Sequence, residues 1–367
     1  MDKEIFDKLH EIGNGFLLKG EFIEYELITR GNINTTYRVK YKTPEGLDKY
    51  YVFQKVNTYV FKNPCDIMKN IDYVTEHLRE KSLNGVALHY YHTANRDNYL
   101  FDEDGAFWRV FNFVTGTVTY QLSSDPKVLY MAGRAFGTFQ TQLSDFEAEK
   151  LYTTIPDFHN TKKRLEGFFA NVEKDECGRV ASVAAEIDYV REKRELASRL
   201  SEMLERGELP LRVTHNDTKI NNVLFDEKTL EPVVVIDLDT VMPGLPAHDF
   251  GDAVRFAANT AEEDEKDLSK VSFDLDLYRA FAEGFVETAT GLTEIELESL
   301  ALGAVTIAIE LGMRFLDDYI TGDKYFKTNY EGHNLDRCRC QFELARDMER
   351  KFVQMNEIVR ETASKKR

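Results

Sequence analysis

Residues 214–222 read Thr-His-Asn-Asp-Thr-Lys-Ile-Asn-Asn, and the interpretation of the whole chain starts from this stretch. It contains the pattern His-x-Asp-x-x-x-x-Asn, formed by His215, Asp217 and Asn222. A short apolar run, a polar turn and a Val-Val-Val-Ile run then lead to Asp237. This order predicts a loop followed by a hairpin that places a second carboxylate beside the loop.

These side chains are the parts that kinase-type phosphoryl transfer needs. Asp217 is expected to orient and deprotonate an acceptor hydroxyl. Asn222 and Asp237 are expected to bind Mg²⁺, with Asp239 as an alternative second metal ligand. His215 is expected to hold the loop rather than to react. An aspartate that only caps a turn would explain Asp217 alone, but not the amide and the second carboxylate at these offsets.

A literal Asp-Phe-Gly occurs at residues 249–251. It follows Pro-Gly-Leu-Pro instead of a strand, and it leads into a helix-like segment at 252–258. We therefore interpret Asp249 as a residue that starts a helix or braces a loop, and not as a metal ligand.

A second group of candidate residues lies near the N-terminus, between two expected strands. Residues 31–36 read Gly-Asn-Ile-Asn-Thr-Thr, and Asn32 and Thr35 are expected to contact nucleotide phosphates. One glycine is weak evidence against an ordinary hairpin turn. The position of this loop about 20 residues before Lys55 strengthens the nucleotide-binding interpretation.

Lys55 lies in the third expected strand and is the predicted phosphate-binding lysine. Its partner should be a carboxylate on the following helix, for which Glu76 is the first candidate and Asp72 the second. A solvated helix face is the alternative for both acids. The sequence has no Gly-x-x-x-x-Gly-Lys-Ser/Thr loop, which disfavours a P-loop enzyme.

The element pattern predicts an α+β fold with two lobes. Alternating β-forming runs at 22–28, 35–41 and 50–56, a helix at 64–79 and strands at 89–91 and 106–111 indicate a small β-rich N-lobe. Helices are expected at about 125–143, 160–207, 274–290, 293–320 and 335–360. With a hinge at 111–116, the pattern predicts a nucleotide-binding lobe at 1–113 and a helical catalytic and substrate-binding lobe at 114–367.

Composition indicates a globular enzyme. Hydrophobic residues make up 43% of the 367 residues and aromatic residues 12%, which argues against disorder. The net charge of −17 disfavours nucleic acid and anionic membranes as partners. Four scattered cysteines, no signal pattern and no run of 18 apolar residues predict a cytoplasmic protein. Cys338-x-Cys340 near His333 is interpreted as part of an amphipathic helix, because no second ligand pair exists.

Two residues late in the chain are candidates for acceptor binding. Arg314 lies among apolar neighbours, where an unpaired charge is costly. Either a buried salt bridge or a polar contact to substrate hydroxyls or an acyl group would explain it. Tyr325, in Gly-Asp-Lys-Tyr-Phe-Lys, is a candidate ring surface for a sugar.

On these motifs the chain resembles the aminoglycoside phosphotransferase and choline kinase superfamily, which has a protein-kinase-like fold. The strings at 214–225 and 235–244 are similar to the N-acetylhexosamine 1-kinases, as are Arg-Phe-Leu-x-Asp-Tyr from 314, Gly-Asp-x-Tyr-Phe-Lys from 322 and Asn-Leu-Asp-Arg-Cys-Arg from 334. The similarity runs through most of the chain and is densest over 211–340. Two points depart from a kinase pattern: the loop at 31–36 is poor in glycine, and the partner of the lysine is not identified.

The resemblance implies ATP- and Mg²⁺-dependent phosphorylation of the anomeric hydroxyl of N-acetylglucosamine or N-acetylgalactosamine. It implies Asp217 as the base, Asn222 and Asp237 as Mg²⁺ ligands and Lys55 as a phosphate contact. It also implies a sugar site that involves the two acceptor-binding candidates.

Other hypotheses stay open at this point. The same chemistry would serve an aminoglycoside, choline, homoserine or another sugar as acceptor. A nucleotide-binding pseudokinase is disfavoured because base, amide and metal carboxylate occur together, and a metal-dependent hydrolase is disfavoured because further His ligands are lacking. No Ala-Pro-Glu segment follows Asp237, which argues against a protein kinase. We expect a monomer, with a dimer as the alternative.

Overall fold

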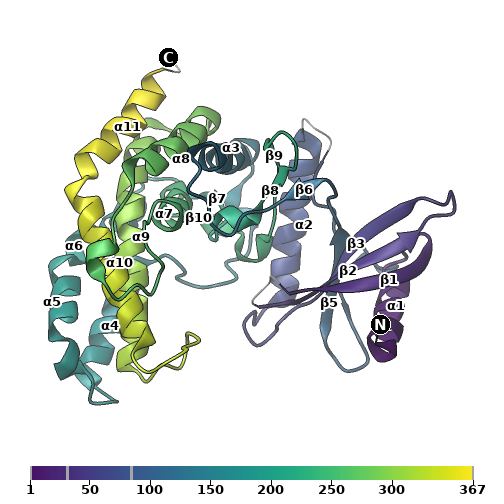
Figure 1. Cartoon of the computed structure of the whole chain (residues 1–367), viewed down its shortest axis with the longest axis horizontal. Helices are drawn as coiled ribbons and strands as arrows, with labels where there is room; N and C mark the ends of the chain where they lie inside the picture. Colours follow the sequence, from purple (N-terminus) through teal and green to yellow (C-terminus); the bar gives the residue numbers. More distant parts are fainter. Residues whose placement is uncertain (1, 30–32, 83–85, 366–367) are drawn as a thin grey trace.

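The computed structural model describes residues 2–29, 33–82 and 86–365. It has a small lobe built on an antiparallel sheet and a larger lobe built mostly of helices, which Figure 1 shows side by side. The predicted α+β class and its two-lobed, protein-kinase-like arrangement are confirmed. The division of the chain between residues 113 and 114 stays a prediction. Asn32 and the glycine before it lie outside the described residues.

The sheet of the small lobe has the strand order β1-β2-β3-β5-β4. Its strands are β1 Glu21–Ile28, β2 Thr35–Lys42, β3 Asp48–Lys55, β4 Leu100–Phe101 and β5 Phe107–Asn112. Helix α1, Lys3–Gly15, packs on one face, and helix α2, Pro64–Lys81, lies between the sheet and the helical lobe (Figure 1). The expected strand at 89–91 is reduced to a single bridge between Tyr90 and Phe111.

The two faces of the sheet pack against different helices. Tyr51 and Phe53 of β3 form one cluster with Ile12 and Phe16 of α1. Side chains alternate between the faces of a strand, so Gln54 points to the opposite face, toward α2 and the larger lobe. The same alternation places Lys55, at the end of β3, on the α1 face.

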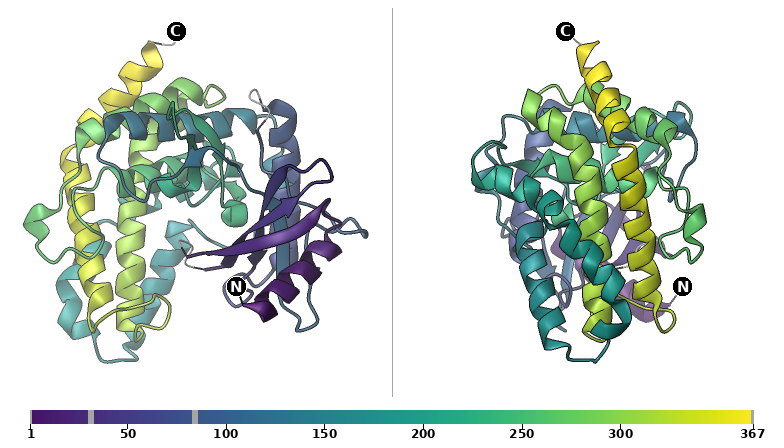
Figure 2. Two further views of the ribbon diagram at one scale, coloured as in Figure 1. Left: turned by 45° about the vertical axis from the view of Figure 1, so that its right-hand side comes forward. Right: turned by 90° about the vertical axis from the view of Figure 1, so that its left-hand side faces the viewer.

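The larger lobe is a helical assembly around α9, Glu294–Ile320. The other helices are α3 Pro126–Gln142, α4 Thr161–Lys174, α5 Ala184–Glu192, α6 Arg194–Glu205, α7 Pro246–Ala257, α8 Leu275–Thr288, α10 His333–Arg350 and α11 Phe352–Ser364. Helix α9 lies alongside α10 (Figure 2). Two long expected helices are interrupted: 160–207 forms three helices, and 335–360 forms two that meet at Lys351.

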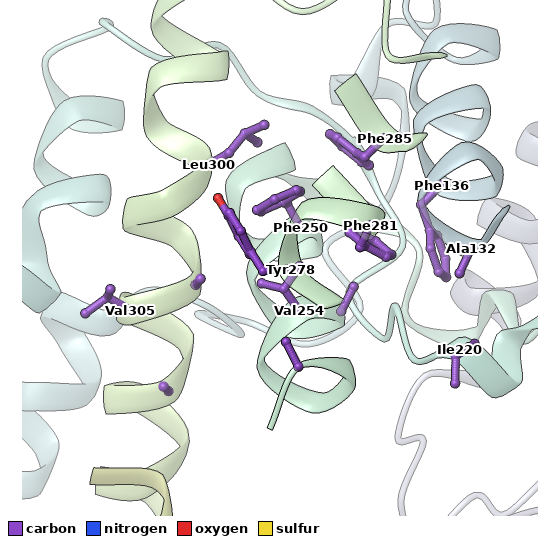
Figure 3. Close-up of a cluster of buried hydrophobic side chains, with 14 of the residues drawn as sticks. Ala132, Phe136, Ile220, Phe250, Val254, Tyr278, Phe281, Phe285, Leu300 and Val305 are labelled. Carbon is purple, nitrogen blue, oxygen red and sulfur yellow. The ribbon is translucent and has the colours of Figure 1, made fainter. Parts of the chain in front are cut away.

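The core of this lobe is aromatic. Phe250 of α7 contacts Tyr278, Phe281 and Phe285 of α8 edge-on, with ring centroids 5.3–5.7 Å apart (Figure 3). Helix α9 is long and apolar enough to cross a membrane, but 89% of its apolar window is buried inside the structure. In this fold it is therefore the central core helix.

Short strands connect the core to the loop that contains Asp217. Strand β7, Arg212–Thr214, pairs with β10, Met242–Gly244, and β8, Val223–Asp226, pairs with β9, Pro232–Val235, and with β6, Thr117–Val118. The predicted hairpin after Asn222 is thus present. The two pairs place the loop at 215–222 between the sheet of the small lobe and helix α7.

Helices α7 and α9 cross at glycines. A Cβ atom at Gly303 of α9 would lie 1.9 Å from the carbonyl oxygen of Ala247 in α7. A Cβ atom at Gly251 of α7 would lie 2.5 Å from the backbone of Gly303. Such contacts are with backbone atoms that cannot rotate away, so this crossing requires glycine on both helices.

We expect Gly303→Ala to lower the free energy of unfolding by about 3 kcal/mol, because the added methyl forces α7 and α9 apart. Gly167→Ala in α4 is the matched control, since a Cβ atom there meets nothing within 4 Å. The control should raise stability by roughly 0.5–1 kcal/mol through helix propensity. Urea denaturation measures both, and equal effects of the two substitutions would contradict the close-packed crossing.

Candidate active site

The loop at 215–222 is held by a carboxylate from helix α7. The backbone N–H groups of His215 and Asn216 each donate to Asp249, at 2.8 Å to separate carboxylate oxygens. Gln140 also donates to Asp249, at 3.2 Å. Asn216 has a left-handed φ of 62°, so the chain turns sharply just before Asp217. The sequence-based interpretation of Asp249 as a loop-bracing residue is confirmed.

His215 is also part of the support of the loop. Its Nε2 lies 2.9 Å from the carbonyl oxygen of Ile236, and its Nδ1 accepts from the backbone N–H of Asp217 at 3.3 Å. The rings of Phe136 and Phe139 contact it edge-on, with centroids 5.8 and 5.9 Å away. The imidazole is buried, and its contacts agree with the expected structural role.

Asp217 and Asn222 lie against each other. The Nδ2 group of Asn222 donates to the backbone carbonyl of Asp217 at 2.8 Å and to its Oδ2 at 3.1 Å. The other carboxylate oxygen, Oδ1, pairs with Nζ of Lys219 at 2.8 Å. Because the amide nitrogen of Asn222 faces Asp217, its amide oxygen is the atom suited to a cation.

Asp237 completes this group at the end of β9. It has a left-handed backbone, with φ 62° and ψ 61°, which turns the chain out of the strand. Burial, together with the nearby carboxylates of Asp239 and Asp217, raises the pKa of Asp237 to about 6, although Arg109 and His215 oppose the rise. The residue as a whole is nonetheless exposed to solvent, so a cation can reach it, and a carboxylate crowded by negative charge is stabilised by a cation.

The donor set fits Mg²⁺. One carboxylate and one amide oxygen are hard ligands, and Mg²⁺ in kinases takes few protein ligands and completes its shell with phosphates and water. Within the described part of the chain, no cluster of three or more His, Cys, Asp or Glu side chains could hold a metal.

Asp239 is engaged by the small lobe. Its carboxylate pairs with the guanidinium of Arg109 in β5 and accepts from Nδ2 of Asn34 at 3.0 Å. Both Asp239 and Arg109 are buried. The alternative of Asp239 as a second metal ligand therefore competes with an ion pair that already uses both of its oxygens.

Arg109 was missed by sequence reasoning, although a signal was present. It is the one charged residue in the apolar run Phe-Trp-Arg-Val-Phe, where an arginine requires a buried partner. Gln54 and the face of Tyr90 also contact its guanidinium. The cationic side chain that the sheet directs at the Asp237 region is therefore Arg109.

The predicted nucleotide contacts of the small lobe are placed differently from expectation. Thr35 and Lys55 are exposed cross-strand neighbours on the α1 face, because strand alternation turns Gln54 and not Lys55 toward α2. Glu76 is exposed and pairs with Arg79 at 3.9 Å, and Asp72 contacts His92 at 3.2 Å. Neither acid forms an ion pair with Lys55 in the described structure, so the expected lysine–carboxylate pair is not formed.

Arg314 and Tyr325 do come together. The guanidinium of Arg314 lies over the rings of Tyr325 and Phe326, at 5.9 and 5.5 Å from their centroids. Tyr325 is 74% exposed, which leaves its ring available for contact. Arg314 forms no ion pair with any described residue, so the salt-bridge explanation of this arginine is not supported.

Glu310 lies one turn before Arg314 on α9, and its carboxylate is bound by neighbouring side chains. It contacts His159 at 2.9 Å, Thr161 at 2.5 Å and Arg164 at 3.6 Å. Burial would raise the pKa of Glu310, but His159, Arg164 and Thr161 together lower it to about 2. Glu310 is thus an ionised, satisfied carboxylate.

Lys219 is a second residue that sequence reasoning did not single out. It lies two residues after Asp217, between the carboxylates of Asp217 and Asp252. Burial lowers the pKa of Lys219, but these two carboxylates raise it overall. Asp252 is held in turn by Arg255 at 3.0 Å and by the backbone N–H of Thr218 at 3.2 Å.

A pocket of about 180 Å³ lies beside the loop. It is lined by Asn216, by residues 242–245 of the β10 region, by part of 153–160 and by α6. Its two carboxylates, Asp157 and Glu205, pair with Lys163 and Lys162 at 3.0 and 2.7 Å. Arg314 and Tyr325 are not among its lining residues.

Comparison with known proteins identifies the family of this chain. The model of the phosphotransferase enzyme family matches residues 24–283, more than half of the chain. The protein therefore belongs to the phosphotransferase enzyme family. The match includes Asp217, Asn222 and Asp237 and ends before α9, which carries Arg314.

Solved structures share the fold at low identity. An aminoglycoside phosphotransferase from Alicyclobacillus acidocaldarius superimposes with a TM-score of 0.61 at 12% identity, covering 96% of both chains. A microcompartment-associated aminopropanol kinase gives 0.60 at 15%, covering 95% of this chain and 98% of its own. Amicoumacin kinase, solved with AMP-PNP, Ca²⁺ and its ligand, gives 0.55 at 15%, covering 94% and 96%.

The raised pKa of Asp237 predicts a pH dependence of stability. The folded protein binds a proton at Asp237 more tightly than the unfolded chain does, so this stabilisation is full below about pH 4 and is lost as the pH rises through about 6. Without metal, Asp237→Asn should remove part of the decline in unfolding free energy between about pH 4 and 7.

Urea denaturation in a chelator measures this decline. Asp226→Asn is the control, because the pKa of this half-buried carboxyl is lowered by hydrogen bonds from Thr229 and Lys228, and the substitution should leave the decline in place. If the unfolding free energy of Asp237→Asn declines with pH as steeply as that of the unsubstituted protein, Asp237 is not the group that causes the decline.

Proposed function

We propose that this phosphotransferase transfers the γ-phosphoryl group of ATP to the anomeric hydroxyl of an N-acetylhexosamine, giving the sugar 1-phosphate. Family membership supports phosphoryl transfer, and the resemblance of 211–340 to the N-acetylhexosamine 1-kinases supports the acceptor. The observation that carries the proposal is the convergence of Asp217, Asn222 and Asp237 on one site.

The geometry suits general-base catalysis. Oδ1 of Asp217 is paired with Lys219, and Oδ2 faces Asn222, so the carboxylate has a fixed orientation at the loop. An acceptor hydroxyl within hydrogen-bond reach would give its proton to Asp217 while it attacks the γ-phosphorus. An anomeric hydroxyl is more acidic than an ordinary alcohol, so a carboxylate is a sufficient base.

Asn222 and Asp237 would hold Mg²⁺, which would neutralise charge on the phosphates of ATP. Asp249 keeps the loop rigid by accepting from two consecutive backbone N–H groups, so Asp217 stays aligned without moving during the reaction. Lys219 offsets the negative charge that Asp217 and Asp252 bring to the site.

Charge on the acceptor side favours an uncharged acceptor. Glu310 is neutralised by its partners, and Asp318 accepts backbone N–H bonds of 2.8–2.9 Å from Lys324, Tyr325 and Phe326. Arg314 adds a positive charge without a carboxylate partner in the described structure. A cationic acceptor would meet this charge unfavourably, whereas a neutral sugar can offer hydroxyl or amide oxygens to the guanidinium and a face to Tyr325.

The proposal is tested by phosphorus NMR of the purified protein with ATP, Mg²⁺ and either N-acetylglucosamine or N-acetylgalactosamine. We expect a new sugar 1-phosphate signal, which Asp217→Asn abolishes. Choline, ethanolamine and an aminoglycoside serve as cationic alternatives and should leave ATP intact. Transfer to one of these, with none to either sugar, would replace the proposed acceptor while keeping the kinase chemistry.

Arg314→Met should raise the KM for the sugar about tenfold or more, because a charge-assisted hydrogen bond is lost. The KM for ATP should stay unchanged. Arg191→Met is the matched control, since Arg191 also lies over an aromatic ring, Phe169 at 5.9 Å, but on the exposed side of α5. Steady-state kinetics separate the two constants, and an unchanged sugar KM in Arg314→Met would remove this residue from the acceptor site.

A further inference from the structure

The carboxylate of Asp239 joins two separate segments of the small lobe to the catalytic lobe. Nη2 of Arg109, in β5, lies 3.0 Å from its Oδ2, and Nη1 of Arg109 contacts Oδ1. Nδ2 of Asn34, just before β2, donates to Oδ2 at 3.0 Å. Asp239 is 3% exposed, so these bonds are shielded from water.

Both small-lobe partners are themselves fixed. Oε1 of Gln54 accepts from Nε of Arg109 at 2.8 Å, and Nε2 of Gln54 donates to Thr36 at 2.9 Å. Oδ1 of Asn34 accepts from the backbone N–H of Asn57 at 2.9 Å. Side chains on the α2-facing side of the sheet therefore link β2, β3 and β5 to one carboxylate. This carboxylate is Asp239, two residues after Asp237.

This arrangement explains why two acidic residues follow β9 with different roles. A metal bound by Asp239 would have to displace Arg109 or Asn34, and a displaced Arg109 would be a buried charge without its partner. Asp237 forms no ion pair with any described residue, and the neighbouring carboxylates of Asp239 and Asp217 favour a cation beside it.

We propose that Asp239 is a positioning residue that fixes the Asn34 end of the β1–β2 connection and strand β5 over the catalytic loop, so that the nucleotide phosphates are held in register with Asp217 and Asp237. The proposal rests on the proposed phosphoryl transfer from ATP, since it describes how the small lobe is aligned for that step. Asn34 and Arg109 act through this carboxylate and are positioning residues as well.

The proposal predicts different effects on nucleotide, metal and acceptor. Asn34→Ala removes one bond to Asp239 and leaves the Arg109 pair intact, so the fold should persist. We expect the KM for ATP to rise about tenfold. The KM for the acceptor and the Mg²⁺ concentration at half-maximal rate should stay within about twofold, because neither site is touched.

Asn171→Ala is the matched control. Nδ2 of Asn171 donates to Asp317 at 2.9 Å, so the substitution also removes a partly buried Asn–Asp bond, but one that lies wholly within the helical lobe. It should leave the KM for ATP unchanged. Equal effects of the two alanine substitutions on this constant would overturn the proposal.

Exchanging the carboxylate and the amide between positions 239 and 34 distinguishes a positioning role of Asp239 from a metal-binding role. Asp239→Asn alone leaves Arg109 without its carboxylate and should strongly weaken ATP binding. Combining Asp239→Asn with Asn34→Asp places a carboxylate at residue 34 of the small lobe and an amide at residue 239. The contact between these two side chains again has one carboxylate, so ATP affinity should recover at least in part. If Asp239 is a metal ligand, the double substitution cannot recover activity and the Mg²⁺ requirement rises; that result would overturn the proposal.

Calorimetric titration with AMP-PNP and Mg²⁺ gives the same comparison without turnover. If the unsubstituted protein fails to phosphorylate any acceptor but binds AMP-PNP, the proposed function fails while the positioning role is still measured by the affinities of the variants. Unfolding midpoints of all variants show whether the fold is retained. A folded Asn34→Ala variant with unchanged AMP-PNP affinity would overturn the positioning role by itself.

Discussion

The central physical constraint of this molecule is the close approach of three carboxylates, of which Asp239 is buried, Asp217 is half-buried and Asp237 is exposed. Like charges at such short range are tolerated only when each is compensated separately. Lys219 compensates Asp217, and Arg109 compensates Asp239. Asp237 has no paired cationic side chain in the described structure, and its pKa is raised to about 6. Asp237 is therefore the carboxylate that a bound cation would compensate, and the amide oxygen of Asn222 can serve as a second ligand of that cation.

Helix α7 connects this site to the stability of the helical lobe. Asp249 in its first turn accepts the backbone bonds of the loop, and Asp252, nearly one turn later, neighbours Lys219. Phe250, between them, points into the aromatic core of α8, while Gly251 allows the close crossing with α9. The same short helix therefore meets the catalytic loop, the core and α9 on different sides, so errors in core packing would be transmitted directly to the position of Asp217.

The parts that sequence predicted well are those whose geometry is set within a short stretch. The spacing from His215 to Asn222 and the hairpin to Asp237 fix the loop locally, and the class of fold follows from the order of strands and helices. The parts that were missed depend on which face of a strand meets which helix. Whether Gln54 or Lys55 faces α2 is a choice of one residue in register, which inverts every side chain on the strand. Sequence alone left this choice open, so it predicted a pair between Lys55 and Glu76, which is not formed, and did not identify the pair between Arg109 and Asp239.

The difference between features set within a short stretch and features set by individual side chains also explains why family membership determines the reaction but not the acceptor. Residues 24–283 match the family, and they contain the loop and the hairpin whose geometry phosphoryl transfer requires. The acceptor site that we propose lies on α9 and the segment after it, where Arg314, Tyr325 and the pairing of Glu310 with His159 are properties of individual side chains. Structures that agree with this chain in fold at 12–15% identity need not share any of them. Acceptor choice must therefore be argued from local charge: Arg314 has no ion-pair partner among the described residues, and on this we base the proposal of a neutral acceptor rich in oxygen atoms.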